Sequence, residues 1–220
     1  MRPTAGLLAT TTAAIMLAAS GHAFAGSGNT ISIIQERTFG VEGNTLVVDQ
    51  TDADSSEVTG LNRTTLGNSL DSTSAIQRGN GNEASLTIEG QGGTIQLLQD
   101  NSSSQGEGNT ATVDVSNGGL ARVGQVGSGN LATLSVSGAL TEGNIFQNGT
   151  DNTAGLTVDG TNASGTITQN GDNITTNLAV TGAGTSVDYT ANGQNVTNVP
   201  GGGVQVYTNG ATVTITQTAF

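Results

Sequence analysis

The sequence predicts an all-β fold, namely a flattened β-solenoid with two strands per rung and repeats of about 22 residues. Glutamines recur at positions 77, 99, 125, 147 and 169, in steps of 22, 26, 22 and 22 residues. A regular period of this size is typical of solenoids and other repeat arrays. Apolar and polar residues alternate between the glutamines, which is the pattern of strands with one buried face.

The first strand of each repeat follows an asparagine. After Asn82, the apolar residues Ala84, Leu86 and Ile88 stand at alternate positions with mostly polar residues between them. Side chains of a strand point alternately to its two faces, so these residues are expected in the core. The predicted core consists of Ala84, Leu86, Ile88, Ala111, Val113, Val115, Ala132, Leu134, Val136, Ala154, Leu156 and Val158.

The second strand of each repeat carries the glutamine. The residue two positions before it is apolar, as in Leu97 before Gln99, so both side chains are expected on one inward face. Gly, Asn and Asp, which tolerate the positive φ of tight turns, separate the strands and leave no room for a helix. The single step of 26 residues is explained by a turn lengthened at 100–108, so like strands are expected to stack in parallel about 4.8 Å apart.

Stacked repeats superpose identical side chains and predict ladders of hydrogen-bonded amides. A buried amide without partners costs a few kcal/mol, whereas each member of a ladder donates to one copy and accepts from another. Glutamine has no turn preference, so the ladder is its expected role, while the asparagines are either ladder members or ordinary turn residues. The ladder residues, expected to act in assembly, are Gln77, Gln99, Gln125, Gln147, Gln169, Asn82, Asn109, Asn130 and Asn152.

The chain divides into four expected parts. Residues 1–25 have an apolar stretch after Arg2 and a small-x-small site at Ala23–Ala25, which predicts a cleaved secretory signal peptide. Residues 26–72 are expected to be divergent rungs or a loop. The solenoid repeats are expected over 73–199, and a C-terminal β-hairpin over 200–220, after the break at Pro200 and three glycines.

Composition excludes several classes of function. Without residues 1–25 the chain has no His, Cys, Lys, Met or Trp, and four arginines face 17 carboxylates, a formal charge of −13. Such a surface repels nucleic acid and anionic membranes. We expect no enzyme activity, no cofactor, no metal site and no membrane insertion. Nucleophilic catalysis by His, Cys or Lys has no residue to carry it, and the nonapeptide calcium repeat is absent.

The frame Gln-x-Gly-x-x-Asn-x-Ala occurs at 77–84, 125–132 and 147–154 and resembles the repeat of curlins, the subunits of bacterial curli fibres. The resemblance covers about 73–182, with weaker echoes at 35–50 and 185–199. It implies a secreted subunit that self-assembles into amyloid fibres of the biofilm matrix at the bacterial cell surface, for adhesion and aggregation. The implied partners are further copies of the chain, a related nucleating or major subunit and an outer-membrane secretion channel.

The chain departs from the curlin pattern at several positions. The slot six residues after the asparagine, which holds a second Gln in curlins, is aliphatic here, for example Ile88 and Val115. In the fifth repeat Asn173 comes one residue early and Ile174 takes the asparagine slot, which predicts a bulge or a shortened turn. Other roles for the same coil remain open: a surface adhesin that does not polymerise, a nucleating or accessory subunit, or an ice-binding protein with stacked threonines.

The C-terminal strand is an expected site of self-association. Residues 211–217 alternate, carry no charge and have high β propensity, and no polar cap follows them. An uncapped strand of this kind invites a strand from another chain. The alternative is that this strand pairs with the preceding rung and the array ends there.

Overall fold

A computed structural model gives the structure of the chain. It describes residues 15–16, 27–36, 43–50, 52–61, 74–104, 106–197, 204–207 and 210–219. Within these ranges the chain is all-β, without a helix. The expected leader, apart from 15–16, lies outside the described residues, as do 62–73 and the connection at Pro200–Gly203.

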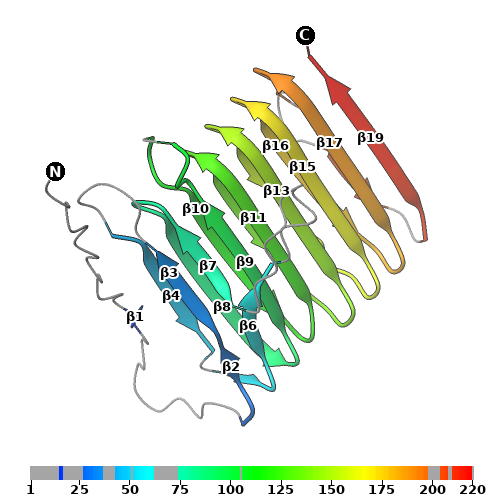
Figure 1. Cartoon of the computed structure of the whole chain (residues 1–220). Helices are drawn as coiled ribbons and strands as arrows, with labels where there is room; N and C mark the ends of the chain where they lie inside the picture. Colours follow the sequence, from blue (N-terminus) through cyan, green and yellow to red (C-terminus); the bar gives the residue numbers. More distant parts are fainter. Residues whose placement is uncertain are drawn as a thin grey trace, which may run out of the picture.

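The strands form two sheets in which every described pair is parallel. Consecutive strands alternate between the two, so each strand pairs with the equivalent strand of the next repeat and not with its chain neighbour (Figure 1). The first sheet contains β1 (Ile15–Met16), β4 (Thr45–Asp49), β5 (Ala53–Asp54), β8 (Glu83–Gln91), β10 (Thr110–Ser116), β12 (Leu131–Ser135), β14 (Thr153–Gly155), β16 (Thr175–Thr181) and β18 (Val204–Tyr207).

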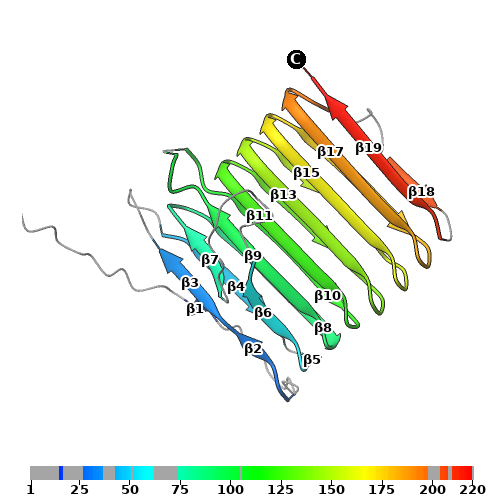
Figure 2. The ribbon, with the colours of Figure 1, turned by 45° about the vertical axis from the view of Figure 1, so that its right-hand side comes forward.

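The second sheet holds the glutamine strands and runs in the same direction. Its order follows the chain from β2 at one end to β19 at the other, so the two described ends of the chain lie at opposite ends of the stack (Figure 2). Its strands are β2 (Thr30–Ile31), β3 (Ile33–Glu36), β6 (Glu57–Gly60), β7 (Ala75–Arg78), β9 (Thr94–Asp100), β11 (Leu120–Ser128), β13 (Glu142–Thr150), β15 (Ser164–Asp172), β17 (Ser186–Gln194) and β19 (Thr212–Thr218).

The core lies between the two sheets. All twelve residues predicted for it have 3% or less of their surface exposed, and they contact one another in one cluster. Their register is regular, for example Ala84 beside Ala111 and Ala111 beside Ala132. Aliphatic residues of the second sheet, such as Leu97 and Val123, complete the cluster from the opposite side.

The turns have the backbone that the sequence predicted. Asp151 and Asn173 occupy equivalent turn positions with φ of 55° and 54°, so the fifth repeat contains neither a bulge nor a shortened turn. That prediction was wrong because Asn173 replaces Asp151 as the left-handed residue, and the substitution changes no length. Gly149 has φ of 134°, and a Cβ on it would stand 1.9 Å from the carbonyl oxygen of Gly171, so successive turns stack too closely for a side chain.

The expected C-terminal hairpin is not formed. β18 pairs in parallel with β16 in the first sheet, and β19 pairs in parallel with β17 in the second. The two strands therefore lie in different sheets and repeat the pattern of the preceding pair. The prediction was wrong because Gln217 lies 26 residues after Ala191, the step already seen once between Gln99 and Gln125. Near the other end, β2 to β6 also join this pattern, since β2 pairs with β6, and β6 with β9.

Candidate functional site

A ladder of glutamines runs along the inner face of the second sheet. Its members are neighbours in register, and the side-chain Nε2 of each donates to Oε1 of the next one toward the C-terminus. The N···O distances from Gln77 to Gln169 are 2.8, 2.9, 2.9 and 2.8 Å. Each of these glutamines is at most 1% exposed. Five buried amides thereby share one chain of hydrogen bonds, which removes the cost of burying them singly.

Each glutamine also ties the two sheets together. The Nε2 of Gln125 donates to the carbonyl oxygens of Thr110 at 2.9 Å and Asn130 at 3.0 Å, both at the start of first-sheet strands. The other ladder glutamines make the equivalent pair of bonds. The side chain therefore satisfies backbone acceptors at the turn that joins its own strand to the next one.

A second ladder is formed by the asparagines where the first-sheet strands begin. Oδ1 of Asn82 accepts from the backbone N–H of Asn109 at 3.0 Å and from its Nδ2 at 3.2 Å. Asn109 and Asn130 are related in the same way, as are Asn130 and Asn152. These asparagines combine a turn position with ladder bonding. Their amides donate toward the N-terminus, opposite to the glutamines.

Both ladders begin earlier than the sequence analysis placed them. Gln35 donates to Gln77 at 2.6 Å, and Asn82 donates to Asn44 at 3.1 Å. The segment between β6 and β7 stretches the spacing from Gln35 to Gln77 to 42 residues, so a search for a period of 22 missed them. The signal that could have found them is the distance of nine residues from Gln35 to Asn44, close to the ten residues between Gln99 and Asn109.

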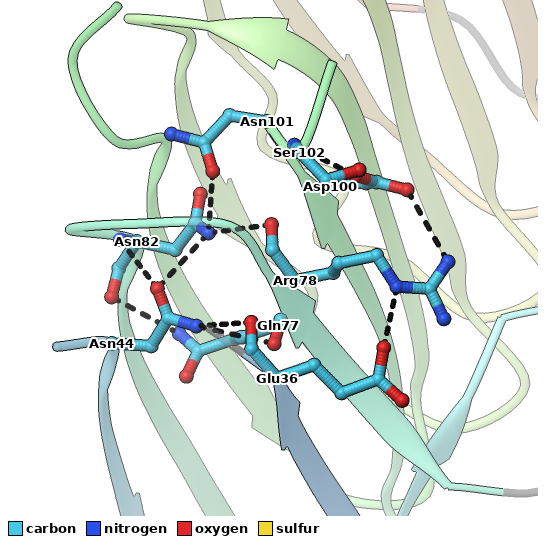
Figure 3. Close-up of polar contacts among 8 residues, drawn as sticks. All are labelled: Glu36, Asn44, Gln77, Arg78, Asn82, Asp100, Asn101 and Ser102. Carbon is cyan, nitrogen blue, oxygen red and sulfur yellow. Dashed lines mark hydrogen bonds and ion pairs between the residues drawn. The ribbon is translucent and has the colours of Figure 1, made fainter. Parts of the chain in front are cut away.

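The lengthened turn contributes Asn101 to the first part of the asparagine ladder (Figure 3). Its Oδ1 accepts from Nδ2 of Asn82 at 3.1 Å and from the backbone N–H of Asn80 at 2.9 Å. In the next repeats the equivalent asparagine donates to a turn carbonyl, as Asn109 does to Gly127 at 2.9 Å. Asn101 thus supplies an acceptor where the longer turn moves the backbone away.

Charged residues line the outside of this same turn (Figure 3). Nε of Arg78 lies 2.6 Å from Oε2 of Glu36, and its Nη1 lies 3.7 Å from Oδ2 of Asp100. The Asp100 carboxylate also accepts the backbone N–H of Ser102 at 3.0 Å. Partly exposed pairs of this kind contribute little stability, so their role is to fix the turn.

The glutamine ladder stops at Gln169. The next position in register is Ala191, and Nε2 of Gln169 donates to Oγ1 of Thr176 at 3.0 Å. Thr176 occupies the slot that is alanine in the four preceding repeats. Ile174 replaces the asparagine, and it packs with Tyr189, Ala191 and Val196 in a separate apolar cluster. Burial raises the pKa of the Tyr189 hydroxyl, which donates to Oε1 of Gln217 in β19.

The two ends of the second sheet are open. In the described part of the chain, β2 and β3 have strand partners on one side only, and so does β19. Oε1 of Gln35 at the N-terminal end is buried and has no hydrogen-bond donor. A buried acceptor without a donor costs about 1–3 kcal/mol, so this end of the ladder lacks a partner.

The acidic groups do not assemble into a reactive site. Hydrogen bonds from Thr150, donated by its hydroxyl at 2.6 Å and its backbone N–H at 2.8 Å, hold the pKa of Asp172 below its ordinary value. Among the described residues, no three carboxylates or imidazoles come together in a metal-binding group. Across the same residues, no helix has the length and apolar character to span a membrane. The chemistry on display is therefore backbone and amide hydrogen bonding.

The sequence-predicted residues thus lie in two ladders and one core, and the open strand edges are the remaining functional feature. Comparison with known proteins gives no further identification: no family model, no curated protein and no solved structure matches the chain.

Proposed function

We propose that the chain is a secreted structural subunit that self-assembles into curli-like amyloid fibres of the extracellular biofilm matrix, for adhesion and aggregation. Its two sheets would be the faces of a flattened β-solenoid with two strands per rung. The observation that carries the proposal is the pair of open edges on a fully parallel stack whose neighbouring strands pair like with like. Such edges are templates for strands of another copy.

The amide ladders support the same proposal. A ladder can be extended by adding another glutamine strand, and each added strand gives the preceding amide a new acceptor. Gln35 at one edge already has a buried oxygen without a donor. β19 at the other edge alternates Thr with inward residues and carries no charge, so electrostatic repulsion does not oppose a neighbour there.

Location and partners follow from the resemblance to curlins. They comprise export through residues 1–25 as a signal peptide, passage through an outer-membrane secretion channel, and incorporation into fibres at the cell surface. Further copies of the chain are the main partners, and a related nucleating or major subunit is another. No enzyme activity, metal or cofactor belongs to this function. A hydrolase panel on the purified chain checks the first of these absences.

A second function is a surface adhesin or accessory subunit that does not polymerise alone. The favouring observation is the change near the C-terminus, where Ala191 interrupts the glutamine ladder and Ile174 ends the asparagine ladder. An interrupted ladder weakens one joint of the stack. On this alternative the chain would add to a fibre of another subunit without elongating it.

The test is assembly of the chain from residue 26 onward at micromolar concentration, followed by thioflavin T fluorescence, electron microscopy and fibre diffraction. The expected result is fibres with a meridional reflection near 4.8 Å. A persistently monomeric, β-rich species would exclude homopolymerisation and favour the adhesin. The variant with Gln77, Gln125 and Gln147 changed to Leu should assemble poorly, while Asn148→Ala, on an exposed position of the same sheet, should assemble normally.

A further inference from the structure

We infer that copies of this chain join head to tail in one register, with β19 of one copy pairing in parallel with β2 and β3 of the next, so that Gln217 stands opposite Gln35. The inference rests on the proposed self-assembly and specifies its polarity and its contact residues. Four observations on the two edges lead to it: their sequences, their backbone groups, their amides and their exposed apolar side chains.

The two edge segments have the same sequence pattern. Thr30–Glu36 reads Thr-Ile-Ser-Ile-Ile-Gln-Glu, and Thr212–Thr218 reads Thr-Val-Thr-Ile-Thr-Gln-Thr. Aligned without a gap, the inward positions hold an aliphatic residue, an isoleucine and a glutamine in both segments. Internal neighbours such as β13 and β15 match in the same way, with Ile145 beside Ile167 and Gln147 beside Gln169. A junction between the two edges would therefore repeat an internal pairing.

The backbone groups at the two edges are complementary in this register. Thr30 and Ser32 donate their N–H groups inward to the adjacent strand, so the alternate residues Ile31, Ile33 and Gln35 face the open side. Ala211 and Ala219 are bonded to β17, so the even-numbered residues of β19 face outward. β17 also presents its even-numbered residues to the odd-numbered ones of β19, which is the arrangement that the junction requires.

The amides at the two edges are also complementary, and they define the direction. Every glutamine of the ladder donates toward the C-terminus, so the N-terminal Gln35 ends as an acceptor with no donor. At the C-terminal edge, Oε1 of Gln217 accepts from the Tyr189 hydroxyl, which leaves its Nε2 group to donate. Across the junction this Nε2 would donate to Oε1 of the next Gln35. The donor and acceptor are those that the internal ladder uses.

Head-to-head contact does not satisfy these groups. Two N-terminal edges would place two Gln35 acceptors against each other, and a two-fold axis would pair the strands antiparallel, unlike every described pair in the stack. Two C-terminal edges would oppose two donors. Only the head-to-tail contact continues the parallel ladder, and it also covers Ile31, an inward residue of β2 that is 37% exposed at the bare end. Fibres would therefore be polar, with the ladder broken once per copy, at Ala191.

Disulfide trapping tests the register directly, because the chain has no cysteine of its own. Ile34 and Thr216 are exposed outward residues that this register places side by side. Neighbouring strands lie about 4.8 Å apart, within the Cα separations that a disulfide accepts. Separate I34C and T216C chains are mixed, assembled and mildly oxidised. The expected product is the I34C–T216C heterodimer, and neither variant alone should cross-link.

Matched controls separate this inference from the proposed function. I34C mixed with T212C is displaced by four residues and should cross-link at least tenfold less than the matched pair. Fibres in which I34C links to itself, or links to T212C as well as to T216C, would overturn the register while leaving self-assembly intact. A chain that stays monomeric would overturn both. As a second readout, Gln217→Leu should slow elongation on the order of tenfold by removing one hydrogen bond per junction, and an unchanged rate would contradict the amide contact.

Discussion

Nε2 of Gln169 donates to Oγ1 of Thr176 at 3.0 Å, and this bond ends the glutamine ladder. In the preceding repeats the amide meets another amide in the next strand. Here the next strand offers Ala191, and a threonine in place of alanine supplies the acceptor. The exchange keeps a buried donor satisfied where the ladder stops, and it joins a polar array to the apolar cluster around Tyr189.

The first prediction follows from this exchange. Ala191→Gln alone should destabilise the chain by about 2 kcal/mol, because a larger side chain enters a fully buried site beside Tyr189. The triple variant T176A, Y189I and A191Q restores the residues of the preceding repeat and should return to within about 1 kcal/mol of wild type, since contacting residues couple by such amounts. Urea unfolding of unassembled chain measures both. Equal destabilisation of the single and triple variants would show that the three positions are independent.

The second prediction concerns one internal amide. Gln147→Leu keeps the volume but removes the donor to Oε1 of Gln169, so unfolding should become easier by about 2 kcal/mol. Asn148→Ala, at the adjacent exposed position, should change the free energy of unfolding by no more than about 0.5 kcal/mol. Chemical denaturation of both variants is the measurement. If the two differ by less than the experimental error, the ladder does not stabilise the stack.

The third prediction concerns a turn glycine. Gly149→Ala should cost about 3 kcal/mol or more, because its φ of 134° disfavours a side chain and its Cβ would stand 1.9 Å from the carbonyl oxygen of Gly171. Gly43→Ala is the matched control, since nothing lies within 4 Å of the added carbon. Thermal unfolding by circular dichroism compares them. A tolerated alanine at 149 would mean that successive turns can move apart.

The fourth prediction is a pH dependence at Asp172. The hydrogen bonds from Thr150 favour the carboxylate, so the pKa is lower in the folded chain than in the unfolded one. The resulting stabilisation is present above the unfolded pKa of about 4 and is lost as the pH falls through the folded value. Carboxyl NMR titration should give Asp172 a midpoint below that of an exposed aspartate, and Thr150→Val should raise it. An unchanged midpoint in the variant would exclude Thr150 as the cause.

Much of the fold is readable from local sequence because each strand repeats a short-range rule. Alternation identifies the buried face, and Gly, Asn and Asp identify the turns. The spacing of the glutamines gives the register of Gln99, Gln125 and Gln147, which the structure pairs in that order. Strict repetition carries this information, so the prediction is best where neighbouring repeats are most alike.

The errors lie where a residue's role depends on a neighbouring repeat. Asn101 is one of several polar residues in a lengthened turn, and nothing local distinguishes it as the partner of Asn82. Gln35 was missed because the segment between β6 and β7 hides the period. The C-terminal hairpin was predicted because Pro200 was interpreted as a break in the array. The chain instead continues past it, and β19 takes its place beside β17.

The position of Tyr189 gives the chain an optical probe of its own. The chain has two tyrosines and no tryptophan, so its ultraviolet emission comes from tyrosine alone. Tyr189 is buried, and its hydroxyl donates to Gln217 in the terminal strand. In a Tyr207→Phe background the remaining emission would come from one ring next to that strand. Its intensity and its alkaline titration would then follow changes at the C-terminal edge without any attached dye.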